Sequence, residues 1–197
     1  MTKQAEITLW SFYTEDAPQL LSGGMLALPE QGVGALTDDA GKDALRARYD
    51  AAHPDEPAGA RTVAVNLLYR FAHEVRTGDF VLMRSRHEEG AYLGEIAGEY
   101  VYRAEEPRAH RRSVRWLRHL ELRDMSPGAA REISYASASP LFAVHAYADE
   151  FLAPYGVGSA ASSRRKAYRL LASLPEANVR MLLGLMKSMQ TQNRKTA

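Results

Sequence analysis

Arginine side chains gather in one short stretch of the chain. Of the 25 basic residues only five are lysine, and residues 108–123 hold six arginines and two histidines against one acidic residue, Glu121. The planar guanidinium group binds a phosphate or a guanine edge through two parallel hydrogen bonds, which the lysine ammonium cannot do. The stretch therefore predicts contacts with a nucleic-acid backbone. These contacts would be made by four of its arginines, by one shortly before it and by two from a nearby turn: Arg84, Arg86, Arg103, Arg108, Arg111, Arg112 and Arg115.

The arginine cluster could also arise without any role in binding. A high arginine content follows from a GC-rich genome, so the clustering is more informative than the abundance. The cluster can also be a solvated strand face whose guanidinium groups pair with Glu99, Glu105 and Glu106. Both alternatives stay open at the level of the sequence.

Aromatic side chains are the second candidate for chemistry. A protein that reads a modified base takes the base out of the stack and holds it between flat side chains. Asp38 has the carboxylate that would accept a hydrogen bond from the edge of such a base, or it caps a helix. The rings can instead be ordinary core residues. The candidates for the base pocket are Trp10, Phe12, Asp38, Tyr69, Tyr100 and Tyr102.

Catalytic motifs are missing from the sequence. A nuclease of the Mrr type needs Glu or Gln two positions before a lysine to hold a metal ion and water, and none of the five lysines meets this condition. The sequence has no Gly-x-Ser-x-Gly elbow, no Walker loop, no His-Glu-x-x-His motif and no cysteine. His110 and His119 flank the basic strand and are expected at the surface. We therefore expect no enzyme, no metal and no cofactor.

Length and composition favour one folded domain with an extension. The chain has 197 residues, of which 46% are hydrophobic, and a formal net charge of +1. This composition supports a packed core and does not resemble that of a disordered chain. No uncharged apolar run reaches the length of a membrane span, and the first residues lack the apolar core of a secretory signal. We expect a cytoplasmic protein that does not bind membranes.

Apolar periodicity and turn residues predict a mixture of strands and helices. Strands are expected over residues 7–12, 25–28, 80–83, 91–97, 100–102, 111–117 and 141–145. Helices are expected over residues 43–52, 60–76 and 126–133, the second of which ends at Gly78. We place one domain at residues 1–147 and a helical C-terminal extension at residues 148–197, with helices over 164–173 and 175–190.

The order of these elements carries a family resemblance. A helix runs into Gly78 and Asp79, two apolar strands follow, and an arginine-rich strand ends in Trp116. This order, over residues 7–146, resembles the PUA-like barrels of the EVE type found at the N-terminus of Mrr-like and McrB-like restriction proteins. The resemblance implies an α+β fold, with a small mixed β-barrel flanked by helices. It also implies a DNA-binding reader that flips a modified base of a duplex into an aromatic pocket, in restriction or phage defence.

Two further functions stay open. A PUA-like protein can bind single-stranded RNA, with bases stacked on the same rings and the 2′-hydroxyl read beside the basic strand. Alternatively, the chain is a non-catalytic structural or regulatory subunit that acts through its C-terminal helices. Those helices would contact an effector nuclease or a second copy of the chain.

Overall fold

The computed structural model describes residues 7–29, 31–37, 41–85, 87, 89–134, 139–155, 178, 180 and 181. The helix predicted over residues 164–173 lies outside this part of the chain, as do all but three residues of the helix predicted over 175–190. Within the described part, no helix is long and apolar enough to cross a membrane.

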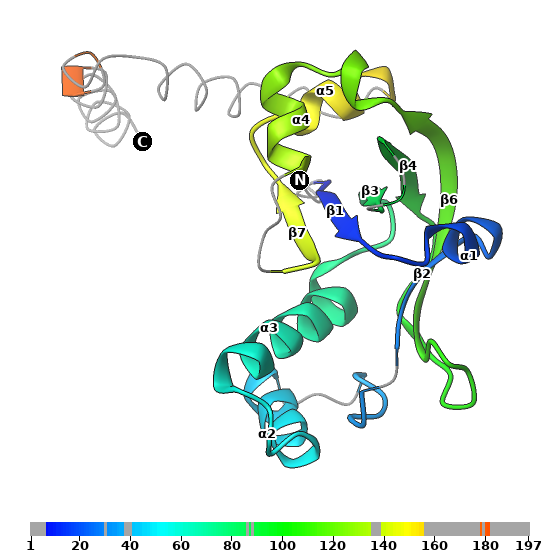
Figure 1. The fold of residues 1–197 in the computed structure, drawn as a ribbon, viewed down its shortest axis with the longest axis vertical. Coiled ribbons are helices and arrows are strands. Elements are labelled where there is room, and N and C mark those ends of the chain that lie inside the picture. Colours follow the sequence, from blue (N-terminus) through cyan, green and yellow to red (C-terminus); the bar gives the residue numbers. More distant parts are fainter. Residues whose placement is uncertain are drawn as a thin grey trace, which may run out of the picture.

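The fold is α+β, built on one strongly curled sheet that forms a half-barrel (Figure 1). The strand order is β2-β6-β4-β3-β1-β7, and β5 pairs with β6 outside this path. β1 and β3 are parallel, whereas all other neighbouring pairs are antiparallel. The strands are β1 (Leu9–Tyr13), β2 (Met25–Leu28), β3 (Phe80–Arg84), β4 (Ala91–Ile96), β5 (Val101–Tyr102), β6 (His110–Leu120) and β7 (Leu141–Val144).

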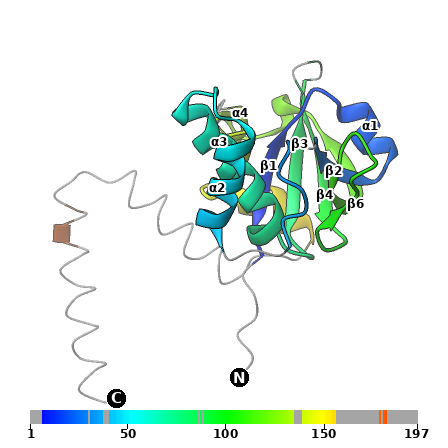
Figure 2. The same ribbon diagram turned by 90° about the horizontal axis from the view of Figure 1, so that it is seen from below.

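Helices cover this sheet on several sides. In Figure 1, α4 and α5 lie on one side of the strands and the α2–α3 pair on the other, while Figure 2 shows α1 across the sheet from α2 and α3. Short 3-10 turns follow β6 and α5. The helices are α1 (Ala17–Ser22), α2 (Lys42–Ala52), α3 (Ala58–Tyr69) with the π-helical turn η1 (Arg70–Glu74), α4 (Pro127–Ser134) and α5 (Ala148–Leu152).

The central strands are buried on both faces. Successive side chains of a strand point to opposite faces, and β1 accordingly sends Leu9 into one apolar cluster and Trp10 and Phe12 into another. The cluster around Leu9 includes side chains of α4 and α5, whereas the cluster around Trp10 includes side chains of α2 and α3. Strands covered on both faces read as continuous apolar runs, which explains why β3 begins Phe-Val-Leu-Met.

A buried carboxylate joins the first strand to the turn before β3. Asp79 is 4% exposed and accepts hydrogen bonds from the backbone N–H groups of Thr8 and Arg76 and from the indole N–H of Trp10, each at 2.9 Å. Gly78 has φ +89°, a left-handed conformation that suits glycine, and it allows the chain to turn into Asp79. The Gly78–Asp79 turn is structural.

The helix before this turn ends differently from its prediction. It widens into a π-helical turn that stops at Glu74, ahead of the predicted end at Gly78, and the backbone is extended at Val75. The last carbonyl groups of the helix lack hydrogen-bond donors from a following turn, and the side chain of Arg112 supplies them. Its Nε donates to the carbonyl of Phe71 at 2.7 Å, and its Nη2 donates to the carbonyl of Ala72 at 2.8 Å. An arginine of the sheet thus caps the helix.

The domain extends past the boundary expected after residue 147. α5 contributes Ala148, Phe151 and Leu152 to the core, and each is 2% exposed or less. The Glu132 carboxylate of α4 accepts the backbone N–H groups of residues 145, 146 and 147 at 2.9–3.0 Å. Because the link to α5 is tied to α4, the expected boundary falls inside the folded unit.

Candidate nucleic-acid interface

Two of the rings expected in a base pocket lie in the core. Trp10 is 5% exposed and Phe12 is 2% exposed, and both pack in the cluster that includes α2 and α3. The indole N–H of Trp10 is already bonded to Asp79. The expectation that these two rings line an open pocket does not agree with their burial, because a base must reach a ring face to stack on it.

A second pair of expected rings, both partly exposed, lies around a buried histidine. The Tyr100 hydroxyl lies 2.7 Å from Nδ1 of His110, and the Tyr102 and His110 ring centroids are 5.3 Å apart. The pairing of β5 with β6 places Tyr102 opposite His110. His110 is fully buried, so the expectation of a surface residue is wrong. The hairpin between β5 and β6 brings these residues together. In the sequence, this hairpin was indicated by the two strands predicted on either side of residues 103–109.

The loop from residue 31 to residue 37 runs beside this cluster and is held on both sides. Nη1 of Arg48, on α2, donates to the carbonyls of Val33 and Ala35 at 3.1 and 3.0 Å. On the other side, the N–H of Leu36 donates to the Tyr100 hydroxyl at 3.3 Å. Gly32 and Gly34 have positive φ, which the loop needs to present its carbonyls to α2. The sequence pattern did not point to Arg48, because nothing in its helix marks it as a loop contact.

Tyr69, another candidate for the base pocket, does not join this cluster. Tyr69, on α3, has its ring centroid 4.8 Å from that of His73, and Nζ of Lys42 lies 5.7 Å from the Tyr69 centroid. Among the described residues, no ring contact joins Tyr69 to the pair formed by Tyr100 and Tyr102. Asp38 lies outside the described residues, just after the loop that the Tyr100 hydroxyl holds.

The arginines predicted to contact a nucleic-acid backbone differ in their burial and in their ion pairs. Arg112 is 2% exposed and caps the helix end, so its expected contact with a phosphate backbone is wrong. Burial lowers the pKa of its guanidinium group, and the carboxylates of Glu99 and Asp79 act in the opposite sense. Arg108, Arg111 and Arg115 form ion pairs with Asp16, Glu106 and Glu95 respectively. Arg103 is exposed and forms no ion pair with a described residue. Arg86 lies outside the described residues.

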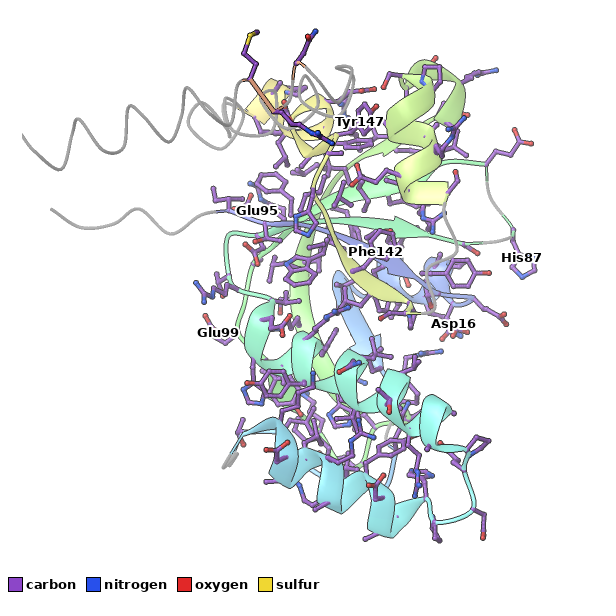
Figure 3. All side chains as sticks on the ribbon, turned by 90° about the vertical axis from the view of Figure 1, so that its left-hand side faces the viewer. Asp16, His87, Glu95, Glu99, Phe142 and Tyr147 are labelled. Atoms are coloured by element: carbon purple, nitrogen blue, oxygen red, sulfur yellow. The ribbon has the colours of Figure 1, made fainter. Side chains whose placement is uncertain are left out.

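These arginines do not form one continuous ridge. Figure 3 shows Asp16 and His87 at one end of the sheet and Glu95 and Glu99 at the other. Arg108, paired with Asp16, therefore lies at the first end, and Arg115, paired with Glu95, at the second. Arg84 ends β3, whereas Glu95 pairs with Phe80 at the start of the same strand. A nucleic acid bound along the sheet would meet basic groups at both of its ends.

Comparison with known proteins places most of the folded chain in a protein family. Residues 21–136 match a family model described as "Domain of unknown function (DUF8426)". The match covers most of the described elements, up to α4, and includes the loop, both tyrosines and the arginine-rich strand. No curated protein matches the sequence.

Proposed function

The chain belongs to the DUF8426 family, and we propose that it is a DNA-binding module that reads a modified base with Tyr100 and Tyr102. We also infer a PUA-like barrel of the EVE type. The inference is supported by the chain order of helix, Gly78–Asp79 turn, two apolar strands and arginine-rich strand, carried on a curled half-barrel sheet.

The observation that carries the proposal is the pair of partly exposed tyrosines at the edge of the half-barrel. Their rings have apolar faces on which a base can stack, and base–aromatic stacking contributes about 1–3 kcal/mol per base. Tyr100 is fixed in place, because its hydroxyl is bonded to the loop and to His110, and the Tyr102 ring lies against His110. Rings held in one geometry lose little conformational entropy when a ligand binds.

The loop beside the tyrosines supplies polar groups for the edge of a base. Its backbone is held by Arg48 and Tyr100, and it leads directly to Asp38. A base stacked beside Tyr100 would meet this segment at its edge, where hydrogen bonds distinguish one modification from another. In this proposal Asp38 keeps its role as the edge-reading carboxylate, whereas Trp10 and Phe12 are core residues.

The phosphate backbone has separate contacts. Arg103 follows Tyr102 directly, is exposed and forms no ion pair with a described residue. Arg115 has a side chain that is 67% exposed, and its surface pair with Glu95 costs little to exchange for a phosphate. Such contacts set the position of the duplex and make affinity depend on salt. Since the sequence has no nuclease motif, the read-out in restriction or phage defence would pass to an effector protein.

The experiment compares duplexes that differ in one base. Fluorescence anisotropy would measure the Kd of the full chain for labelled duplexes carrying methylated, hydroxymethylated or glucosylated cytosine, methylated adenine, or no modification. Tyr102→Ala should bring the affinity for the preferred duplex down to that for the unmodified one. Tyr102→Phe keeps the ring and should retain most of the preference. Arg103→Gln should weaken binding to every duplex alike and reduce the salt slope by about one.

Two outcomes would reject the proposal. One is equal affinity for all duplexes in the wild-type chain. The other is a preference that survives Tyr102→Ala unchanged. Single-stranded RNA serves as a competitor throughout: displacement of the preferred duplex by RNA at lower concentration than by unmodified DNA would point to RNA binding instead.

A further inference from the structure

A second polar feature lies at the carboxyl ends of the two parallel strands. Tyr13 ends β1 and Arg84 ends β3, and the two residues are partners in the strand register. The guanidinium carbon of Arg84 lies 6.0 Å from the centroid of the Tyr13 ring, a cation–π distance. The N–H of Thr14 donates to the Arg84 carbonyl at 2.9 Å and holds the two strand ends together.

Arg84 is half-buried, and none of the described residues supplies a counter-charge to it. Its Nε is buried and has no hydrogen-bond acceptor, and no carboxylate forms an ion pair with its guanidinium group, within the part of the chain that the structure describes. Arg108, Arg111, Arg112 and Arg115, in contrast, each have a carboxylate within 4.0 Å.

The charge of Arg84 persists in spite of this burial. Desolvation lowers the pKa of the guanidinium group, and Tyr13 is the group that acts against this shift. An arginine side chain nevertheless stays protonated at neutral pH. A buried charge is normally paired, because desolvation without a partner is costly. The positive charge of Arg84 is therefore not balanced by a negative charge on any described neighbour.

A second buried polar atom without a partner lies on the same face. Ser11 pairs with Leu82 and Tyr13 pairs with Arg84, so Ser11, Tyr13 and Arg84 point to the same side of the β1–β3 pair. Ser11 is fully buried, and its Oγ has no hydrogen-bond partner among the described residues. Ser11 and Arg84 are diagonal neighbours on these adjacent strands. A hydroxyl and a guanidinium N–H both donate to an oxyanion.

We propose that Arg84 and Ser11 hold a phosphate group at the carboxyl ends of β1 and β3. The guanidinium group supplies the charge and a bidentate contact, and the Ser11 hydroxyl donates to an inward oxygen. This site is distinct from the tyrosine pair that would stack on a base, and it does not depend on that function. The phosphate is either a phosphodiester of a nucleic acid or a free phosphate ion, which have the same oxyanion chemistry.

The test follows amide resonances of the full chain by NMR during titration with inorganic phosphate. Binding should shift the amides of Tyr13, Thr14 and Ser85, and phosphate should raise the Tm of the wild-type chain. Arg84→Gln should weaken phosphate binding by at least about tenfold and remove the Tm increase. Arg76→Gln is the matched control, since it removes an exposed arginine before the start of β3 that belongs to neither proposed site, and should leave both effects unchanged.

Two further arms keep the proposal falsifiable. If Arg84→Gln does not fold, Ser11→Ala, which removes a single oxygen, should still reduce phosphate affinity several-fold. A short DNA duplex that shifts the same amides would identify a phosphodiester, and a duplex that leaves them unchanged would identify free phosphate. The proposal fails if phosphate shifts none of these amides, or if both the Arg84 and the Ser11 variants bind phosphate as tightly as the wild-type chain.

Discussion

The indole nitrogen of Trp10 donates a hydrogen bond to Oδ2 of Asp79 at 2.9 Å, and both side chains are buried. The same carboxylate accepts two backbone N–H groups, one from the residue before β1 and one from the turn before β3. A single acidic group therefore holds the first strand beside the third, although 69 positions separate it from Trp10 in the sequence. Trp10 therefore has a structural role in the sheet.

Removal of the Asp79 carboxylate should destabilise the fold strongly. Asp79→Ala leaves three N–H donors without an acceptor, and each orphaned buried donor costs about 1–3 kcal/mol. We expect the free energy of unfolding, measured in urea, to fall by at least about 3 kcal/mol. Asp55→Ala removes an exposed acid and is the control. An Asp79→Ala variant as stable as this control would show that the hydrogen bonds contribute nothing net.

Arg112 and Arg115, three positions apart on β6, should behave very differently when truncated. Arg112→Met leaves the carbonyls of Phe71 and Ala72 without their donors, and we expect a loss of at least about 2 kcal/mol. Arg115→Met breaks an exposed pair, for which the expected loss is about 1 kcal/mol or less. Urea denaturation of both variants measures the difference. Equal losses would contradict a capping role for Arg112.

The Tyr100 hydroxyl should hold both the loop and the buried His110. Tyr100→Phe removes the acceptor of the Leu36 N–H and the partner of His110 Nδ1, but keeps the ring. Hydrogen exchange at the Leu36 amide should become up to about tenfold faster, as expected for one lost hydrogen bond. The free energy of unfolding should fall by about 1–3 kcal/mol, because Nδ1 of the buried His110 loses its partner. Tyr155→Phe serves as the control. Unaltered exchange at Leu36 would mean that the loop is held without Tyr100.

The helix α5 should prove to be part of the core. Phe151→Ala removes a ring that is 2% exposed, and a buried Phe→Ala change costs about 3–5 kcal/mol. Val101→Ala, at a side chain 46% exposed, should change the free energy of unfolding by about 0.5 kcal/mol or less. If chemical denaturation shows similar small losses for both variants, α5 is an appendage and the domain ends near residue 147.

Alkaline stability should depend on Tyr49. Burial, together with the Glu56 carboxylate, raises the pKa of its phenol above the ordinary value of 10.0. A raised folded-state pKa means that the folded chain keeps the proton longer than the unfolded chain. The stability that the protonated Tyr49 phenol contributes to the folded chain is therefore complete below pH 10. It is lost as pH rises through the folded-state pKa. Thermal melts from about pH 9 to pH 11 should show a shallower decline for Tyr49→Phe than for the wild-type chain. Parallel declines would contradict the shift.

Local patterns were sufficient to predict most of the elements. The apolar runs at residues 25–28 and 80–83 are strands within one residue of their observed ends, and the helix predicted over 43–52 is α2. The α1 helix was missed, since its six residues are too few to show a helical apolar period. The π-helical end of α3 was missed because its cap, Arg112, lies 41 positions from Phe71 in the sequence.

The sequence by itself determined the class of the fold, the strands and the clustering of arginine and aromatic side chains. The tertiary structure alone decided which of them are accessible. β1 lies between β3 and β7 with apolar clusters on both of its faces, so Trp10 and Phe12 are enclosed. Tyr100 and Tyr102 lie by the short β5 at the edge of the sheet and stay partly exposed. Exposure depends on what packs against a residue from distant parts of the chain, and no local pattern encodes it.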